Sequence, residues 1–125
     1  MEKSTEINSN AFMEKPEVKA LRKSYLGKVP NEISIVEKYA TESLEQSEKI
    51  AIDDTYYGIV HKIKGVGGTF GFPLISEAAI KILDMFTKEA KEHTCYLTKD
   101  QGFLLLDLIA DMKKHIEFYQ KELDV

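Results

Sequence analysis

The sequence predicts an all-α protein, an antiparallel four-helix bundle with an additional short N-terminal helix. Two observations predict this class. From Glu17 onward, apolar residues recur at steps of three and four, the spacing that gathers them on one side of an α-helix. The 125 residues contain no alternating β-branched run bounded by turn signals, so no strand is expected.

The chain is expected to divide into a tail and one domain. Residues 1–15 mix Ser, Asn, Glu and Lys without a steady period, which is typical of a flexible tail. Residues 16–125 are expected to form a single helical-bundle domain, because this length suits one hydrophobic core.

The first two helices of the domain are expected to be separate. A short amphipathic stretch from Val18 to Leu26 ends near Gly27, and Pro30 follows, which is the usual order at a helix C-terminus. Pro30 suits the first turn of the next helix, where its missing N–H costs nothing. The sequence therefore predicts a short helix and then a longer one that begins at Pro30.

Three further helices are predicted after this pair. One runs from about Ile52 to Phe70, and Pro73 opens the next. Thr98, followed three residues later by Gln101, resembles a capping box at the start of the last helix. Short connections between long helices favour antiparallel packing, with the short first helix covering one end.

Composition excludes several classes of partner and compartment. The net charge of -4 argues against binding along nucleic acid, where a basic face is expected. No apolar stretch approaches the roughly 20 residues that cross a bilayer, so no membrane association is expected. The polar N-terminus has no apolar signal region. A cytoplasmic monomer is the expectation.

The most informative pattern lies in residues 54–71, DTYYGIVHKIKGVGGTFG. At about 100° per residue, most apolar residues of this stretch gather on one side of a helix, together with Ile52 two positions before it. This predicted core stripe consists of Ile52, Tyr56, Ile59, Ile63, Val66 and Phe70. His61 points almost opposite to the stripe, so we expect its imidazole to be exposed to solvent.

The neighbours of His61 on the helix are unusual. On a helix, the residues three and four positions away are the ones that crowd a side chain. For His61 these neighbours are Tyr57, Gly58, Lys64 and Gly65. Gly68 lies one turn further along the same face. Each helical glycine costs about 1 kcal/mol relative to alanine. Core packing does not explain this cost, because these positions face outward. A cleared surface around an exposed imidazole would let a docking partner approach its nitrogen closely.

These residues resemble the signature of the histidine-containing phosphotransfer (HPt) family, H-x-x-K-G followed by five residues and a glycine. Here the signature reads His61, Lys64, Gly65 and Gly71, with every spacing intact. The resemblance extends over roughly residues 17–123. It implies that residues 16–125 are an HPt domain.

The resemblance also implies a function. His61 would be the phosphorylated residue, through its Nε2 atom, and Lys64 would help to hold the phosphoryl group. Gly65 and Gly68 would keep the approach open, and Gly71 would let the helix end and turn. The protein would be a phosphorelay intermediate in two-component signal transduction, without kinase or phosphatase activity of its own.

The resemblance further implies the partners. A response-regulator receiver domain, a hybrid sensor histidine kinase or both would dock on the His61 face. The receiver would supply an acidic pocket and Mg²⁺, so this chain is expected to hold no cofactor or metal. The glycines expected to contact the partner are Gly58, Gly65, Gly68 and Gly71. Hydrophobic residues that flank this face are expected to contact it as well; these are Tyr57, Phe72 and Ile75.

Other interpretations of the same residues are weaker. A G-x-G-x-x-G loop would fit Gly65 and Gly67, but Phe70 occupies its third glycine position, and no G-K-[ST] triplet occurs. One cysteine and three histidines are too few for a structural zinc site within one chain. Two alternatives remain open: a helical adaptor that binds a receiver or kinase without phosphotransfer, and a purely structural bundle.

Overall fold

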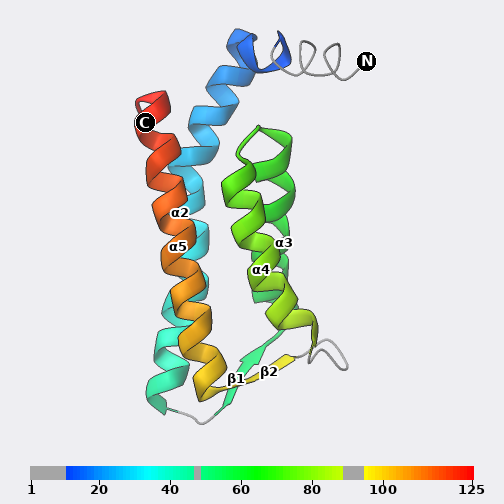
Figure 1. The fold of residues 1–125 in the computed structure, drawn as a ribbon, viewed down its shortest axis with the longest axis vertical. Coiled ribbons are helices and arrows are strands. Elements are labelled where there is room, and N and C mark those ends of the chain that lie inside the picture. Colours follow the sequence, from blue (N-terminus) through cyan, green and yellow to red (C-terminus); the bar gives the residue numbers. More distant parts are fainter. Residues whose placement is uncertain (1–10, 47–48, 89–94) are drawn as a thin grey trace.

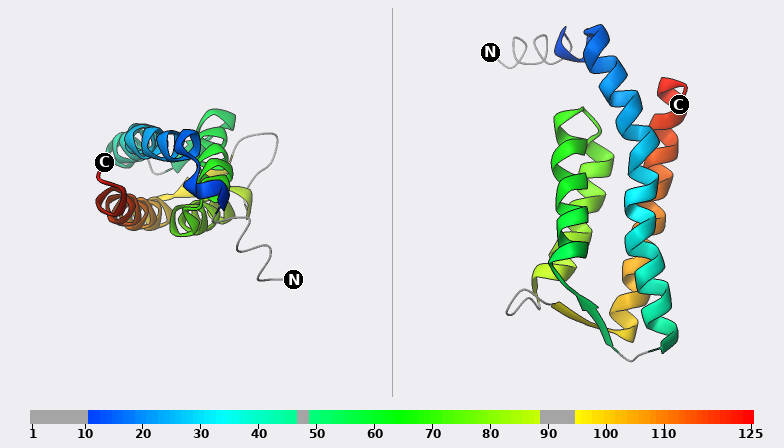
Figure 2. Two further views of the ribbon diagram at one scale, coloured as in Figure 1. Left: turned by 90° about the horizontal axis from the view of Figure 1, so that it is seen from above. Right: turned by 180° about the vertical axis from the view of Figure 1, so that it is seen from behind.

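The structure, a computed structural model, describes residues 11–46, 49–88 and 95–125. Its four long helices alternate in direction along one axis (Figure 1), and an end-on view places them at the corners of a square (Figure 2). They are α2 (Pro16–Gln46), α3 (Asp54–Thr69), α4 (Pro73–Lys88) and α5 (Lys99–Leu123). The predicted all-α class is confirmed.

One continuous helix replaces the two that were predicted at the start of the domain. Pro30 lies inside α2 instead of opening a new helix, so the prediction of an additional short helix ending near Gly27 is wrong. Proline cannot donate the backbone hydrogen bond to the carbonyl four residues earlier. Here the Gln120 side chain donates to that carbonyl, on Leu26, at 2.9 Å.

Part of the predicted tail (residues 1–15) is helical, namely residues 11–14. Met13 lies against the turn between α3 and α4: a Cβ added at Gly71 would be 3.1 Å from the Met13 methyl carbon. Residues 1–10 lie outside the described residues.

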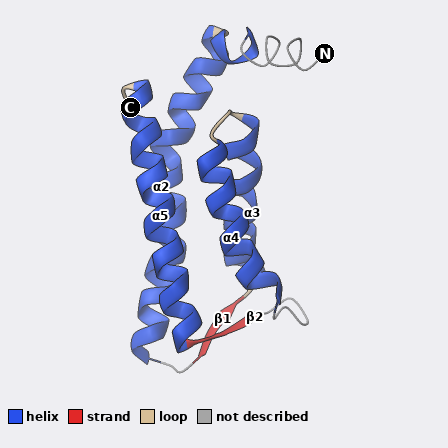
Figure 3. Ribbon diagram, in the orientation of Figure 1, coloured by secondary structure: helices blue, strands red, loops and turns tan. Residues whose placement is uncertain are grey.

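A two-stranded antiparallel ribbon joins the two connections at one end of the bundle (Figure 3). β1 (Lys49–Ile52) pairs with β2 (Cys95–Thr98), with Ile50 opposite Leu97. The expectation of no strand is therefore wrong. Each strand has only four residues, too few for a period of two to stand out, although alternate side chains in each are buried.

The core is apolar throughout the described residues. Buried side chains from all four helices and both strands form one cluster, and no charged or polar residue described is buried in it. No described helix has both the length and the apolar character that a membrane span requires.

Three predicted helix boundaries are confirmed. α4 begins at Pro73. At the start of α5, the Thr98 N–H donates to Gln101 Oε1 at 2.8 Å and the Gln101 N–H donates to Thr98 Oγ1 at 3.2 Å, which is the expected capping box. Gly71 has a φ of 76°, so the chain turns between α3 and α4 at a glycine, as predicted.

Candidate functional site

The first helical turn of α3 is fixed by its N-cap. The Thr55 N–H donates to the Asp53 side chain at 2.9 Å, which satisfies one of the free backbone donors at the helix start. Two turns further on, His61 is exposed, as its position on the helical wheel predicted. The imidazole therefore projects from a regular, capped helix rather than from a loop.

The core face of α3 is rotated from the predicted stripe. Val60, Ile63 and Gly67 are the buried residues, whereas Ile59 and Val66 are only half-buried, as are Tyr56 and Phe70. The difference corresponds to a rotation of roughly 50° about the helix axis at 3.6 residues per turn. The prediction assumed that every large apolar residue faces inward, and part of the stripe instead stays at the surface.

Gly67 lies on the buried side of α3, facing α4. A Cβ added at Gly67 would lie 3.5 Å from the Ser76 backbone nitrogen, 3.5 Å from Ile75 and 3.4 Å from the Tyr25 hydroxyl, which are ordinary van der Waals contacts. Gly67 therefore belongs to the packed face of α3, unlike the glycines on the outer face.

The predicted outer face is open. A Cβ added at Gly58 or Gly65 would have no atom within 4 Å outside its own helix turn, and one at Gly68 would meet only the Ser76 hydroxyl at 3.6 Å. A side chain would fit at these three positions, so steric crowding does not explain why they are glycine. Their effect is to remove side chains from the surface around His61.

Tyr57 and Lys64 flank His61 on the same helix. The Tyr57 and His61 rings lie with centroids 6.0 Å apart and an interplanar angle of 19°. Lys64 is half-buried, and its backbone carbonyl accepts a hydrogen bond from the Ser76 hydroxyl at 3.0 Å. No carboxylate among the described residues pairs with the Lys64 ammonium, which leaves it one helical turn from His61.

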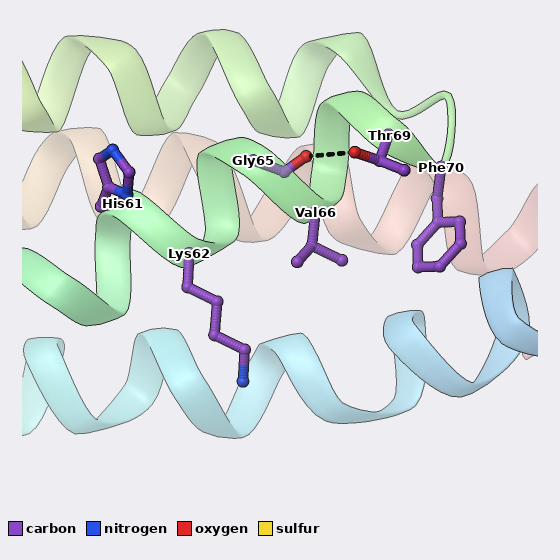
Figure 4. Close-up of a pocket in the computed structure, with 6 residues that line it drawn as sticks. All are labelled: His61, Lys62, Gly65, Val66, Thr69 and Phe70. Carbon is purple, nitrogen blue, oxygen red and sulfur yellow. Dashed lines mark hydrogen bonds between the residues drawn. The ribbon is translucent and has the colours of Figure 1, made fainter.

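A pocket of about 360 Å³ lies beside His61 on the surface of α3. It is lined by His61, Lys62, Gly65, Val66, Thr69 and Phe70 (Figure 4). Most of its lining is apolar. The Thr69 hydroxyl donates a hydrogen bond to the Gly65 carbonyl at 3.0 Å, so its proton is already used within α3.

The Lys62 side chain leaves α3 in a different direction from His61. Figure 4 shows the lysine extending toward α2, where its ammonium pairs with the Glu32 carboxylate at 3.2 Å. The cation nearest to His61 in sequence is therefore held by an acidic partner, in contrast with Lys64.

Two of the predicted partner-binding residues are buried. Phe72 and Ile75 have no exposed surface, so the prediction that they contact a partner is wrong. Phe72 stacks on Tyr25, with ring centroids 5.9 Å apart, and lies 4.8 Å from the Tyr119 ring centroid. Both residues follow the Gly71 turn, which directs the first turn of α4 into the core.

Sequence reasoning missed the pocket residues Lys62, Val66, Thr69 and Phe70. Thr69 lies eight residues after His61 and four after Gly65, so the helical period alone would have placed it on the outer face. Val66 and Phe70 had been assigned to the core because they are apolar. Only the rotation of α3 makes them accessible.

The described residues contain no group of three or more His, Cys, Asp or Glu side chains that could hold a metal ion. Comparison of the chain with protein-family models, with curated proteins and with solved structures found no match. The surroundings of His61 are therefore the basis for a functional proposal.

Proposed function

We propose that this protein is a phosphorelay intermediate that carries a phosphoryl group on His61 and exchanges it with the aspartate of receiver domains in two-component signal transduction. The observation that supports this most directly is the open surface around an exposed histidine. Gly58 and Gly65 leave free space on both sides of His61 along α3. The H-x-x-K-G signature falls on this same surface.

The proposed chemistry needs one reactive atom from this chain. A neutral imidazole has a proton on one ring nitrogen and an in-plane lone pair on the other. The Nε2 lone pair of His61 attacks the phosphorus of the receiver's aspartyl phosphate. The Nε2–P bond forms as the P–O bond to the aspartate breaks, the electron pair leaves with the carboxylate, and the proton stays on Nδ1. The reverse steps return the phosphoryl group to an aspartate.

The surroundings of His61 suit this exchange. A phosphoryl group on the ring would carry negative charge. The Lys64 ammonium one turn away, which pairs with no carboxylate in the described part of the chain, would attract it. The receiver domain would bring its own acidic pocket and Mg²⁺. The reaction then depends mainly on positioning of the two reacting groups. We place the protein in the cytoplasm with its receiver or hybrid kinase partner.

A transfer assay with matched histidine variants tests the proposal. The protein is incubated with receiver domains that carry labelled phosphoryl groups, beside His61→Gln and His115→Gln variants. His115 is a suitable control because it lies on α5 and pairs with Asp111 at 3.3 Å. We expect label on the wild type and on His115→Gln, but none on His61→Gln. The label should be labile to acid and stable to base.

Two outcomes would contradict the proposal. Label on His61→Gln would assign the phosphoryl group to another residue. If active phosphorylated receivers bound the folded wild type without transferring label, the adaptor alternative would be favoured instead.

A further inference from the structure

The open surface around His61 creates a problem for the imidazole itself. A helical side chain is held in place mainly by the residues three and four positions away. For His61, two of these four residues are Gly58 and Gly65, which have no side chain, and a third is Lys64, which is long and flexible. Of these four residues, only Tyr57 offers a rigid surface to the ring.

The Tyr57 ring provides that surface. Helical side chains lean over the preceding turn, so the imidazole of His61 lies over the turn that contains Tyr57. The centroid distance of 6.0 Å and the interplanar angle of 19° describe two nearly parallel rings. Offset stacking at such distances is favourable for aromatic pairs. The contact also leaves the edge of the imidazole free.

The orientation of the ring matters for a nitrogen nucleophile. The lone pair on an imidazole nitrogen lies in the ring plane, so the plane of the ring sets the line along which it can attack phosphorus. A docked receiver presents its phosphoryl group in one direction only. A fixed ring plane therefore raises the fraction of docked complexes in which the two groups are aligned.

We infer that Tyr57 is a positioning residue that fixes the plane of the His61 imidazole for transfer from a docked receiver. The inference rests on the proposed function. It also changes the role that the sequence suggested for Tyr57, because the half-buried Tyr57 acts through His61 rather than through direct contact with the partner.

Two variants of Tyr57 distinguish the effect of ring stacking from the effects of the hydroxyl group and of side-chain size. Tyr57→Phe keeps the ring, and Tyr57→Leu keeps an apolar side chain without a ring plane. Transfer from a labelled receiver is followed in single turnovers over a range of receiver concentrations. We expect Tyr57→Leu to lower the maximal rate about three- to tenfold, the range set by an aromatic pair. The receiver concentration at half-maximal rate should stay unchanged, and Tyr57→Phe should keep the wild-type rate.

A small phosphoryl donor provides the control for nucleophilicity. Phosphoramidate can approach His61 from any direction, so its rate of reaction should not depend on the ring plane. We expect equal His61 labelling by phosphoramidate in the wild type and in Tyr57→Leu, with His61→Gln giving the background. NMR adds a partner-free measurement, because the His61 ring protons should lose the ring-current shift of Tyr57 in Tyr57→Leu and keep it in Tyr57→Phe.

Several results would overturn the inference. Tyr57 would be a direct partner contact if Tyr57→Leu changed only the half-maximal receiver concentration. It would act on the reactivity of the imidazole if phosphoramidate labelling fell by the same factor as transfer. Equal losses in Tyr57→Phe and Tyr57→Leu would assign the effect to the hydroxyl group. A wild type that accepts no phosphoryl group from any receiver contradicts the proposed function instead.

Discussion

The side-chain amide of Gln120 donates a hydrogen bond of 2.9 Å to the backbone carbonyl of Leu26, a residue 94 positions away. This carbonyl would ordinarily accept from the N–H of residue 30, but residue 30 is proline. Leu26 is fully buried, so water does not readily replace the missing donor. The contact between α5 and α2 therefore allows one helix to run through Pro30.

We expect loss of this amide to destabilise the protein. Gln120→Met keeps the length of the side chain and removes the donor, which should lower the free energy of unfolding by about 1–3 kcal/mol. In a Pro30→Ala background, the new N–H can bond to Leu26 and the same substitution should cost much less. Urea denaturation of the four proteins measures this coupling. Equal costs in both backgrounds would show that Gln120 does not compensate for Pro30.

A bulky charged residue on the His61 face should block phosphotransfer without unfolding the protein. Gly65→Glu places a carboxylate where the structure has open space, next to the site of the phosphoryl group. Gly27→Glu is the matched control, because Gly27 is an exposed glycine on α2 with equally free space. We expect both variants to keep the wild-type melting temperature and only Gly65→Glu to lose transfer. Equal transfer rates in the two variants would contradict a partner surface at Gly65.

The turn after α3 should tolerate substitution less than the helix itself. Gly71 has a positive φ and faces Met13, so Gly71→Ala should destabilise the protein by roughly 1–2 kcal/mol. Gly68 is helical, and the nearest atom to an added Cβ is 3.6 Å away. Gly68→Ala should therefore leave stability unchanged or raise it by up to about 1 kcal/mol. Thermal unfolding of the two variants checks this order, and a reversal would contradict the turn geometry.

Alkaline pH should destabilise the protein through Tyr25. Burial, and then the Glu32 carboxylate, raise the pKa of Tyr25 well above its usual range, and its hydroxyl donates to the Ile63 carbonyl at 3.2 Å. Above the unfolded pKa of about 10, the unfolded state loses this proton while the folded state keeps it. The stabilising effect is therefore complete below pH 10 and is lost as the pH rises further.

A comparison of tyrosine variants isolates this effect. Stability measured by urea denaturation from pH 8 to pH 11 should fall less steeply in Tyr25→Phe than in the wild type, by up to about 1.4 kcal/mol per pH unit. Tyr96 is 57% exposed, and Tyr96→Phe is the matched substitution that removes no buried hydroxyl group. The same slope in Tyr25→Phe and the wild type would show that the Tyr25 phenol ionises equally in both states.

Features that depend on residues near one another in the sequence could be predicted. The capping box of Thr98 and Gln101, the start of α4 at Pro73, the turn at Gly71 and the exposure of His61 all follow from spacing within a few residues. Each of these is fixed by local backbone or side-chain chemistry.

Features that depend on distant residues could not be predicted in this way. The continuity of α2 requires Gln120 from the other end of the chain. The β1–β2 ribbon exists because two segments of four residues meet across the α3–α4 pair. The buried positions of Phe72 and Ile75 depend on how α4 packs against α3 at Gly67.

The β1–β2 ribbon has a consequence for the order of folding. Its strands flank the α3–α4 hairpin in sequence, so pairing them closes a long loop and costs more chain entropy than forming a local turn. The hairpin itself shortens that loop, because its two helices return the chain to the same end of the bundle (Figure 1). The helix that bears His61 therefore belongs to a unit that can assemble before α2 and α5 pack against it.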